Sequence, residues 1–405
     1  MHASISERNY DVIIVGARCA GAATAMLLAR EGVRVLALDR QSYGSDTLST
    51  HALMRPAVMQ LARWGLLEPL IRSGAPVIGT TTFHYGAEEI PIPIRPEPGI
   101  PGLIAPRRTV LDRMLVDAAR AAGAVIVHDV AVQDLLRDPS GRVSGVSVRD
   151  PQGRPREIKA PLVIGADGHG SYVARTVQAA IFLRGKASAC CIYGYADAPD
   201  ITGYHWHFDT GASAGAIPTH DGQALIFAAA PTGRFDAELR HDLAASRMAI
   251  LRAVAPGLAE RAATGDTGRI RAFRGVPGLL RQPFGPGWML VGDAGFFRDP
   301  ATSHGISDAF RDAEGAVRAV LGGTGFAMRR YRDERDAIAR PILETTEAIA
   351  ACDWELSELG ERHQRFSEAM KAGTRLIAER QALEAESRSA PPPARTATMP
   401  VLAAR

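Results

Sequence analysis

The sequence lacks the features that identify membrane proteins and nucleic-acid-binding proteins. No stretch approaches the roughly 20 consecutive apolar residues of a membrane-spanning helix, so we expect no integral membrane segment. The formal net charge is only +3 over 405 residues, and the chain has no block of Lys and Arg that would grip a phosphate backbone. We therefore expect no nucleic-acid partner. The 46% of apolar residues is typical of a globular protein.

Cysteine and lysine are both scarce. The cysteines follow neither metal-ligand nor disulfide-framework spacing; they are Cys19, Cys190, Cys191 and Cys352. The N-terminal segment has no basic stretch followed by an apolar core and a small-residue cleavage site, so no secretory signal is visible. Both absences favour a cytoplasmic protein with reduced thiols. The only lysines are Lys159, Lys186 and Lys371, so arginine supplies nearly all of the positive charge.

Residues 10–40 have the pattern of a dinucleotide-binding unit. A short run of Val and Ile at 10–15 predicts a buried parallel strand, and small and apolar residues at helical spacing predict a helix at 20–30. A second apolar run at 33–38 predicts another strand, which ends in Asp39. A strand, a glycine turn, a helix, a strand and a terminal acid within about 30 residues are typical of a βαβ unit that binds a dinucleotide.

The glycine turn of this unit departs from the usual motif at one position. Gly16 permits a tight turn, Gly21 allows the helix to pack closely on the strand, and Asp39 can accept hydrogen bonds from a ribose. The helix N-terminus offers unpaired N–H groups to a pyrophosphate. The middle glycine is absent, because Arg18 occupies the position where the backbone approaches the phosphates most closely.

Two later segments also place an aspartate in a glycine turn after an apolar strand. The strand predicted at 162–164 leads into Asp167 and Gly168, and the strand predicted at 288–291 leads into Gly292 and Asp293. The carboxyl end of a parallel strand is a natural place to meet a ligand.

Elsewhere the pattern predicts a second sheet and several helices. Alternating runs on either side of Gly86 predict a hairpin at 80–94, and short β-like runs dominate 189–230. Runs between 125 and 148 suggest a small β-meander. Further helices are expected at 56–66, 107–122, 236–255 and 305–321, with helical segments continuing to about residue 384.

The three turns, at Gly16, Asp167 and Gly292, together resemble those of FAD-dependent oxidoreductases of the para-hydroxybenzoate hydroxylase fold. This superfamily includes aromatic hydroxylases, geranylgeranyl reductases and flavin-dependent halogenases, and the resemblance covers roughly residues 8–340. It implies an α/β fold in which a Rossmann-like FAD-binding domain has an inserted β-sheet substrate domain and a helical C-terminal region.

The resemblance also divides the chain into domains. The FAD-binding domain would comprise residues 1–78, 106–187 and 276–322. The substrate domain would comprise a hairpin at 79–105 and a sheet at 188–275. C-terminal helices would follow at 323–385, and the Pro-, Ala- and Ser-rich segment 386–405 is expected to be a disordered tail.

The same resemblance implies which residues bind FAD. The first turn would hold the adenosine diphosphate half, Arg108 would approach the phosphates or the ribityl chain, and Asp293 would bind ribityl hydroxyls. Pro300 would line the flavin ring, with the following helix N-terminus aimed at the part that gains negative charge on reduction. The implied cofactor-binding set is Gly16, Arg18, Ala20, Gly21, Asp39, Arg40, Arg108, Asp167, Gly168, Gly292, Asp293, Pro300, Gly305 and Ile306.

Departures from the family's patterns narrow the activity. Many of its hydroxylases have a histidine where this chain has Phe296, which counts against simple phenol hydroxylation. Its halogenases need a lysine within the first 150 residues, where this chain has none. Geranylgeranyl reductases usually carry Cys-Gly-Gly after the second strand, whereas residues 45–51 here read Ser-Asp-Thr-Leu-Ser-Thr-His.

We therefore predict an FAD-dependent monooxygenase that hydroxylates or epoxidises an apolar or aromatic small molecule through a flavin hydroperoxide. NADPH or NADH would be the reductant, used directly or through a separate flavin reductase. The main alternative is a flavin-dependent reductase of a carbon–carbon double bond, followed by a halogenase or a non-catalytic flavoprotein. The substrate and the oligomeric state stay open.

No base constellation is required, because the cofactor carries the difficult step. His304 is the first catalytic candidate, since it lies between the flavin-loop proline and Gly305, and His51 in the polar loop is the second. The candidates for substrate binding are His84, Tyr204 and Trp206.

A metal site at His205 and His207 is also conceivable, because alternate residues of a strand face the same side. The sequence offers no evident third ligand, so no metal site is expected.

Overall fold

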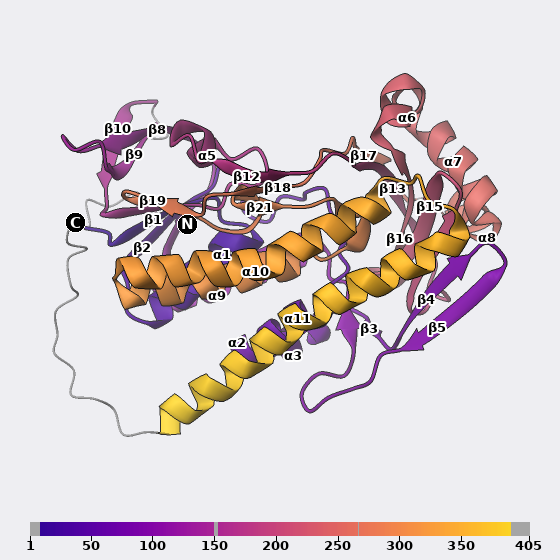
Figure 1. The fold of residues 1–405 in the computed structure, drawn as a ribbon, viewed down its shortest axis with the longest axis horizontal. Coiled ribbons are helices and arrows are strands. Elements are labelled where there is room, and N and C mark those ends of the chain that lie inside the picture. The colour runs from indigo at the N-terminus through magenta and orange to yellow at the C-terminus, as the bar shows by residue number, and fades with distance from the viewer. Residues whose placement is uncertain (1–8, 150–152, 266, 390–405) are drawn as a thin grey trace.

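The computed structural model describes residues 9–149, 153–265 and 267–389, and it confirms the mixed α/β architecture (Figure 1). Its first sheet has the order β19-β20-β11-β1-β2-β7. The strands are β1 (Val12–Val15), β2 (Val35–Leu38), β7 (Val125–Val127), β11 (Leu162–Gly165), β19 (Phe284–Gly285) and β20 (Trp288–Leu290). All neighbours pair in parallel except β19, which is an antiparallel edge strand. The glycine turns after β1, β11 and β20 therefore meet at one edge of this sheet.

Helices cover one face of this sheet, and a small sheet covers the other. On the helical face lie α1 (Cys19–Arg30), α4 (Arg108–Ala121) and α9 (Gly305–Gly322), which share one apolar core. The opposite face packs against α5 (Tyr172–Thr176) and a sheet of β8 (Val132–Arg137), β9 (Val143–Arg149) and β10 (Pro155–Lys159). The predicted meander is wrong in one respect: β7 pairs with β2 in the first sheet, because its apolar residues extend that buried surface.

The second large sheet has the order β17-β13-β16-β15-β14-β4-β5. Its strands are β4 (Thr80–Tyr85), β5 (Glu88–Pro93), β13 (Ala189–Asp197), β14 (Tyr204–Asp209), β15 (Ala212–Pro218), β16 (Gln223–Pro231) and β17 (Arg271–Phe273). The predicted hairpin forms β4 and β5. It joins the sheet through a parallel pairing of β4 with β14, whereas the other neighbours are antiparallel.

Helices on the outer face of this sheet differ from the single helix predicted at 236–255. The segment forms α6 (Thr232–Ala237) and α7 (Leu243–Val254), followed by α8 (Pro256–Gly265). The break occurs at Asp242, whose side chain accepts a hydrogen bond from the Ala245 N–H at 3.0 Å and so caps the start of α7. An Asp at this position favours a helix start over a helix interior.

The C-terminal region is helical, as expected. α10 (Gly325–Ala350) lies along α9, and α11 (Leu356–Ser389) runs obliquely across the molecule from the second sheet (Figure 1). The predicted tail begins at 386, but α11 extends through Ser389; residues 390–405 lie outside the described residues. Among the described helices, none is long and apolar enough to cross a membrane.

The remaining elements connect these layers. They are α2 (Arg55–Trp64), α3 (Leu67–Arg72), the pair β3 (Val77–Ile78) and β6 (Leu103–Ile104), and the sheet of β12 (Ile181–Arg184), β18 (Leu279–Arg281) and β21 (Phe296–Phe297). All four cysteines are buried and unpaired.

Candidate functional site

The first glycine turn has the close backbone contacts that the sequence motif requires. Gly16 has φ +98°, and a Cβ added there would lie 2.4 Å from the carbonyl oxygen of Ala166. A Cβ on Gly21 would lie 1.9 Å from the carbonyl oxygen of Gly16. Only glycine fits both positions without moving backbone. The turn after β1 is therefore packed directly against the turn after β11.

Asp39 stabilises this turn from the end of β2. Its buried carboxylate accepts hydrogen bonds from the Ala17 N–H at 2.7 Å and the Gln41 N–H at 2.8 Å. Each carboxylate oxygen has a further lone pair, so the group can also accept from a ribose hydroxyl. The adjacent Arg40 is exposed.

Arg18 and Arg108 converge on one buried carboxylate that the sequence motifs did not single out. Arg18 lies 3.1 Å from Asp112 and also donates to Ser45 at 3.1 Å. Arg108 binds Asp112 with both Nε and Nη2, at 3.1 and 3.0 Å. Burial alone would lower the pKa of Arg108, but the Asp112 carboxylate outweighs burial and raises it. The substitution of the middle glycine by Arg18 thus ties the turn to α4 and to the 42–50 loop.

The Asp167 carboxylate serves the start of α5. It accepts hydrogen bonds from the hydroxyl of Ser171 and from the N–H of Tyr172 at 2.6 Å. The neighbouring Gly168 has φ +82°, which favours glycine. These bonds hold the turn in place, and its contact with a nucleotide stays a prediction.

The third turn contains a carboxylate that lacks a protein donor. Gly292, in the short 3₁₀ turn Gly292–Ala294, has φ +57°, and a Cβ there would lie 2.9 Å from the Cβ of Ala20. Among the described residues, none donates a hydrogen bond to the half-buried carboxylate of Asp293. Burial, followed by repulsion from Asp308, raises the pKa of Asp293 to about 7. A buried acceptor without a partner fits a ligand that carries hydroxyl groups, as the ribityl chain of FAD does.

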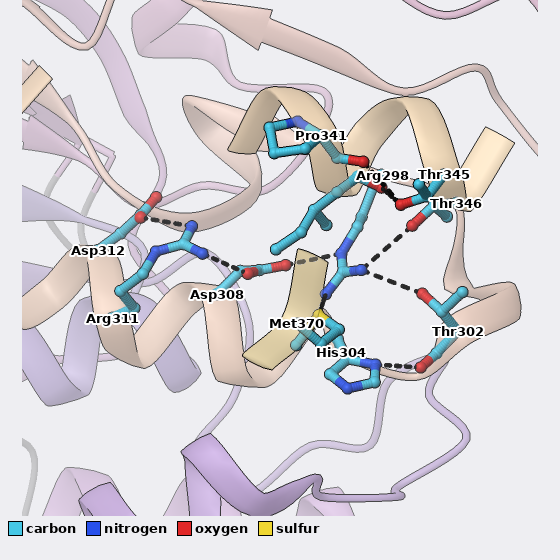
Figure 2. A network of polar contacts seen from close by, with 11 residues as sticks. Arg298, Thr302, His304, Asp308, Arg311, Asp312, Pro341, Thr345, Thr346 and Met370 are labelled. Carbon is cyan, nitrogen blue, oxygen red and sulfur yellow. Dashed lines mark hydrogen bonds and ion pairs between the residues drawn. The ribbon is translucent and has the colours of Figure 1, made fainter. Parts of the chain in front are cut away.

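Buried charges hold the loop that follows this turn. Figure 2 shows Arg298 at the centre, with its Nε 2.7 Å from Asp308 on α9. Its Nη1 donates to the hydroxyls of Thr302 and Thr346, each at 3.2 Å. The other oxygen of Asp308 lies 2.7 Å from Arg311. This network connects the loop to α9 and α10, so the path of residues 298–304 is fixed from two sides (Figure 2).

The N-terminus of α9 is open at the predicted flavin-ring position. Pro300 lies in the turn Pro300–Thr302, and α9 begins at Gly305, followed by the half-buried Ile306. A Cβ added to Gly305 would have no described atom within 4 Å. An 18-residue helix with a free N-terminus presents a positive dipole end and unpaired N–H groups to a ligand.

His304 occupies the N-cap position of this helix without a side-chain capping hydrogen bond, and it contacts the C-terminal region. Its Nδ1 lies close to the carbonyl oxygen of Thr302, and its ring meets Phe366 of α11 edge-on, with centroids 5.2 Å apart. Burial, followed by the charge of Arg298, lowers the pKa of His304 to about 3. His304 is therefore neutral near pH 7 and holds the loop in shape.

His51 lies in a buried polar cluster between the 42–51 loop and β13. It has φ +65°, an uncommon conformation for a residue other than glycine. Its Nε2 is hydrogen-bonded to the hydroxyl of Tyr195, whose ring has Arg107 3.5 Å above it. Burial lowers the pKa of His51 well below its usual value, and its Nδ1 has no partner among the described residues. That nitrogen is available to a polar group of a ligand.

A narrow cavity separates the 298–304 loop from the inner face of the second sheet. Most of its lining is apolar or aromatic and comprises Ala189, Cys190, Cys191, Trp206, Phe208, Ala214, Phe227, Ala229, Pro300 and Ala301. The remaining lining residues are Thr50, Ser213, Asp299 and Ser303. Burial raises the pKa of Asp299 to about 7, and its oxygens accept from the N–H groups of Ala189 and Ala301 at 2.8 and 2.9 Å.

Of the three residues predicted to bind substrate, only Trp206 lines this cavity. The structure places His84 away from this cavity, because it pairs with His207, and both lie on the opposite face of the sheet from Trp206; its contact with a substrate stays a prediction. Tyr204 is fully buried in the core, where its hydroxyl donates to the carbonyl of Ile104 at 2.8 Å.

Several residues of the site were not predicted from the sequence. Asp308 and Arg311 lie three residues apart on a predicted helix, a spacing that signals an ion pair. The pairing of Arg298 with Thr346 carries no such signal, because the two residues are 48 positions apart in the chain.

The comparisons with known proteins agree with this arrangement. Residues 9–346 match the family described as FAD binding domain. Menaquinone reductase of Mycolicibacterium smegmatis is 30% identical over 336 residues, which are 77% of this chain and 76% of that protein. Digeranylgeranylglycerophospholipid reductase 1 of Methanopyrus kandleri is 27% identical over 371 residues, which are 84% and 90% of the two chains.

Among solved structures, p-nitrophenol 4-monooxygenase PnpA from Pseudomonas putida DLL-E4 has a TM-score of 0.74 at 19% identity. The alignment covers 93% of this chain and 98% of that chain. At this identity the likeness shows the fold alone.

Proposed function

We propose that this chain, which belongs to the FAD binding domain family and is a flavin-dependent oxidoreductase, is a monooxygenase of an apolar or aromatic small molecule. The observation that carries this proposal is the apolar cavity between the 298–304 loop and the aromatic face of the second sheet. FAD, when bound, supplies electron transfer and oxygen activation. The protein's part is to hold the substrate in a dry site beside the cofactor.

Five features of the chain would bind FAD. The backbone of the Gly16–Gly21 turn and the N-terminus of α1 would hold the pyrophosphate, and Asp39 would accept from the adenosine ribose. Asp293, to which none of the described residues donates, would accept from the ribityl hydroxyls. The open N-terminus of α9 at Gly305 would stabilise negative charge on the reduced flavin ring.

The cavity residues would bind the substrate by packing and would exclude water. Trp206, Phe208 and Phe227 offer flat apolar surface, and the indole N–H of Trp206 is already bound to Thr81 at 2.9 Å. Asp299 is occupied by backbone donors. His51 does not line the cavity, but the adjacent Thr50 does; the His51 Nδ1, which has no partner among the described residues, would orient a polar substituent that reached it.

NADPH or NADH is the proposed electron source. The sequence has one nucleotide-binding βαβ unit, which FAD would fill, so the nicotinamide would bind transiently in the cleft or reduce a separate flavin reductase. We propose a cytoplasmic location, which the need for reduced nicotinamides supports.

The second candidate is a reductase of a carbon–carbon double bond. Two sequence relatives, described as a menaquinone reductase and a digeranylgeranylglycerophospholipid reductase, favour it. The apolar lining would also suit a prenyl chain, for which the cavity of about 30 Å³ would have to widen. The absence of a Cys-Gly-Gly sequence at residues 45–51 counts against it.

Oxygen dependence distinguishes the two activities. The purified flavoprotein should oxidise NADPH or NADH in the presence of an aromatic or prenyl substrate, and ¹⁸O₂ should label the product. Turnover that continues without oxygen and gives an unlabelled, saturated product would favour the reductase. A protein that cannot be reconstituted with FAD would contradict both. Asp293→Ala should lose bound flavin while retaining its circular dichroism spectrum, whereas the surface variant Asp333→Ala should retain flavin.

A further inference from the structure

The outer face of the second sheet carries three histidines whose ring nitrogens converge. His84 lies on β4, and His205 and His207 lie on β14. One nitrogen from each ring can be chosen so that all three atoms lie within 4.8 Å of one another. His84 Nε2 is 3.3 Å from His205 Nδ1, and the rings of His84 and His207 are parallel with centroids 3.9 Å apart.

The strand register explains this cluster. The parallel pairing of β4 with β14 sets His84 beside His207, and His205 lies two residues earlier on the same face. His84 and His205 are 121 residues apart in the chain. The third ligand that the sequence analysis lacked is therefore supplied by the hairpin.

One of the three imidazoles has an acceptor behind it that fixes the tautomer needed for metal binding. His205 Nε2 donates to the carbonyl of Thr202 at 2.9 Å, which leaves the lone pair of Nδ1 pointing at the cluster. His84 Nδ1 lies 3.9 Å from the carboxylate of Glu89, too far for a hydrogen bond, and its Nε2 lies 3.3 Å from His205 Nδ1. Metal-ligating histidines characteristically direct their second nitrogen to a carbonyl or carboxylate in this way.

The local charges also suit a cation. Glu89 is the carboxylate beside the cluster, and its directly paired residue is His84. Imidazole binds metal through the lone pair of its neutral form. The ring nitrogens of this cluster lie close enough together to share one cation.

We propose that His84, His205 and His207 bind one Zn²⁺ ion. Three imidazoles with a fourth position left to water or Glu89 suit Zn²⁺, and the ring nitrogens, which lie within 4.8 Å of one another, would close around the ion to reach Zn–N distances of about 2.0–2.1 Å. The ion would join the β4–β5 hairpin to β14. The site lies on the opposite face of the sheet from Trp206 and the cavity, so its role is structural and independent of the proposed reaction.

The test is a Zn²⁺ titration of the full chain, purified without a histidine tag and stripped with a chelator. Calorimetry should give one ion per chain with a micromolar or lower dissociation constant. His84→Gln, His205→Gln and His207→Gln should each weaken binding at least tenfold, as should Glu89→Gln through its effect on His84. His128→Gln, which changes a half-buried histidine near the first sheet, should leave binding unchanged.

Two further measurements keep the proposal falsifiable where a variant folds poorly. Zinc-edge X-ray absorption of the wild-type protein should show three imidazole ligands, and Zn²⁺ should raise the melting temperature of the wild type but not of Glu89→Gln to the same extent. Absence of binding, an oxygen-only coordination shell, or wild-type affinity in the three histidine variants would overturn the site. Bound FAD should be the same in all of these proteins, which separates this outcome from failure of the proposed function.

Discussion

The candidate site has two sides, the flavin-side wall and the sheet wall, which are built in different ways. The flavin-side wall, formed by the turns at residues 16–21 and 292–306, depends on close backbone contacts and buried arginine–aspartate pairs. The sheet wall, formed by the inner face of β13–β16, is aromatic and small apolar surface whose polar atoms are bound to nearby protein groups. One wall positions charge, and the other excludes water.

The two walls also differ in how their interactions contribute to the free energy of folding. Buried ion pairs give up much of their Coulomb energy to desolvation, so they favour a particular geometry more than overall stability. Apolar packing stabilises the fold directly and tolerates small shifts. We therefore expect variants of the flavin-side wall to have larger and more pH-dependent effects than variants of the sheet wall.

The largest effect is expected for Arg298→Met. The Arg298 and Asp308 side chains are only 2% and 5% exposed. Removal of the arginine therefore leaves the buried charge of the Asp308 carboxylate with one of its two arginine partners, Arg311. The free energy of unfolding should fall by about 3–5 kcal/mol, measured by urea denaturation. FAD content should fall as well, because the 298–304 loop loses its support (Figure 2).

The control for this variant is Arg72→Met. Arg72 pairs with Glu68 on the surface of α3, with both side chains more than half exposed. Its loss should cost about 0.5 kcal/mol or less. Equal losses in the two variants would contradict the distinction between buried and surface pairs.

The second prediction concerns the pH dependence of the flavin-free protein. The pKa of Asp293 is about 7 in the folded chain against an ordinary 3.8, so the folded state retains a proton that the unfolded state has lost between these values. The contribution of Asp293 to the free energy of unfolding is therefore fully present below pH 3.8 and is lost as the pH rises to about 7. Asp293→Asn removes this loss and should be more stable than wild type above pH 7, by up to roughly 4 kcal/mol.

Denaturation curves at a series of pH values test this prediction. Asp299, with its pKa also raised to about 7, contributes in the same direction and remains in the variant, so the difference between variant and wild type is the relevant quantity. A difference that does not change between pH 4 and pH 8 would contradict the assignment to Asp293.

The smallest effect is expected on the sheet wall. Tyr204→Phe removes one buried hydrogen bond to the Ile104 carbonyl and should cost about 1 kcal/mol without changing FAD binding. Tyr43→Phe, which removes a surface hydrogen bond to Asp117, should cost less. Loss of FAD from Tyr204→Phe would mean that the two walls are not separable.

The sequence predicted the flavin-side wall better than the sheet wall. The roles of Gly16 and Gly21 depend on contacts within the βαβ unit or with the next strand, so a local motif contains the information. The placement of Asp293 followed from the family resemblance. The network of Arg298 was missed, because it joins a loop to residues of two helices that no local pattern connects.

The errors on the sheet wall come from strand pairing. Alternation along β14 shows that His205 and His207 share a face, but not which face points to the cavity. The place of His84 depends on pairing with a strand 121 residues away. Tyr204 and Trp206 share a face as well, yet only the latter reaches the cavity, because the former lies over the β3–β6 pair.

The parallel pairing of β4 with β14 also has a consequence for biosynthesis. During translation the hairpin leaves the ribosome well before β14 exists, and at roughly 5–20 residues per second the interval is on the order of 10 seconds. During that interval, the edge of β4 that later pairs with β14 has no strand with which to form backbone hydrogen bonds. Two prolines on β5, Pro91 and Pro93, lack the N–H groups with which a foreign strand would pair, so the other side of the waiting hairpin is protected from aggregation.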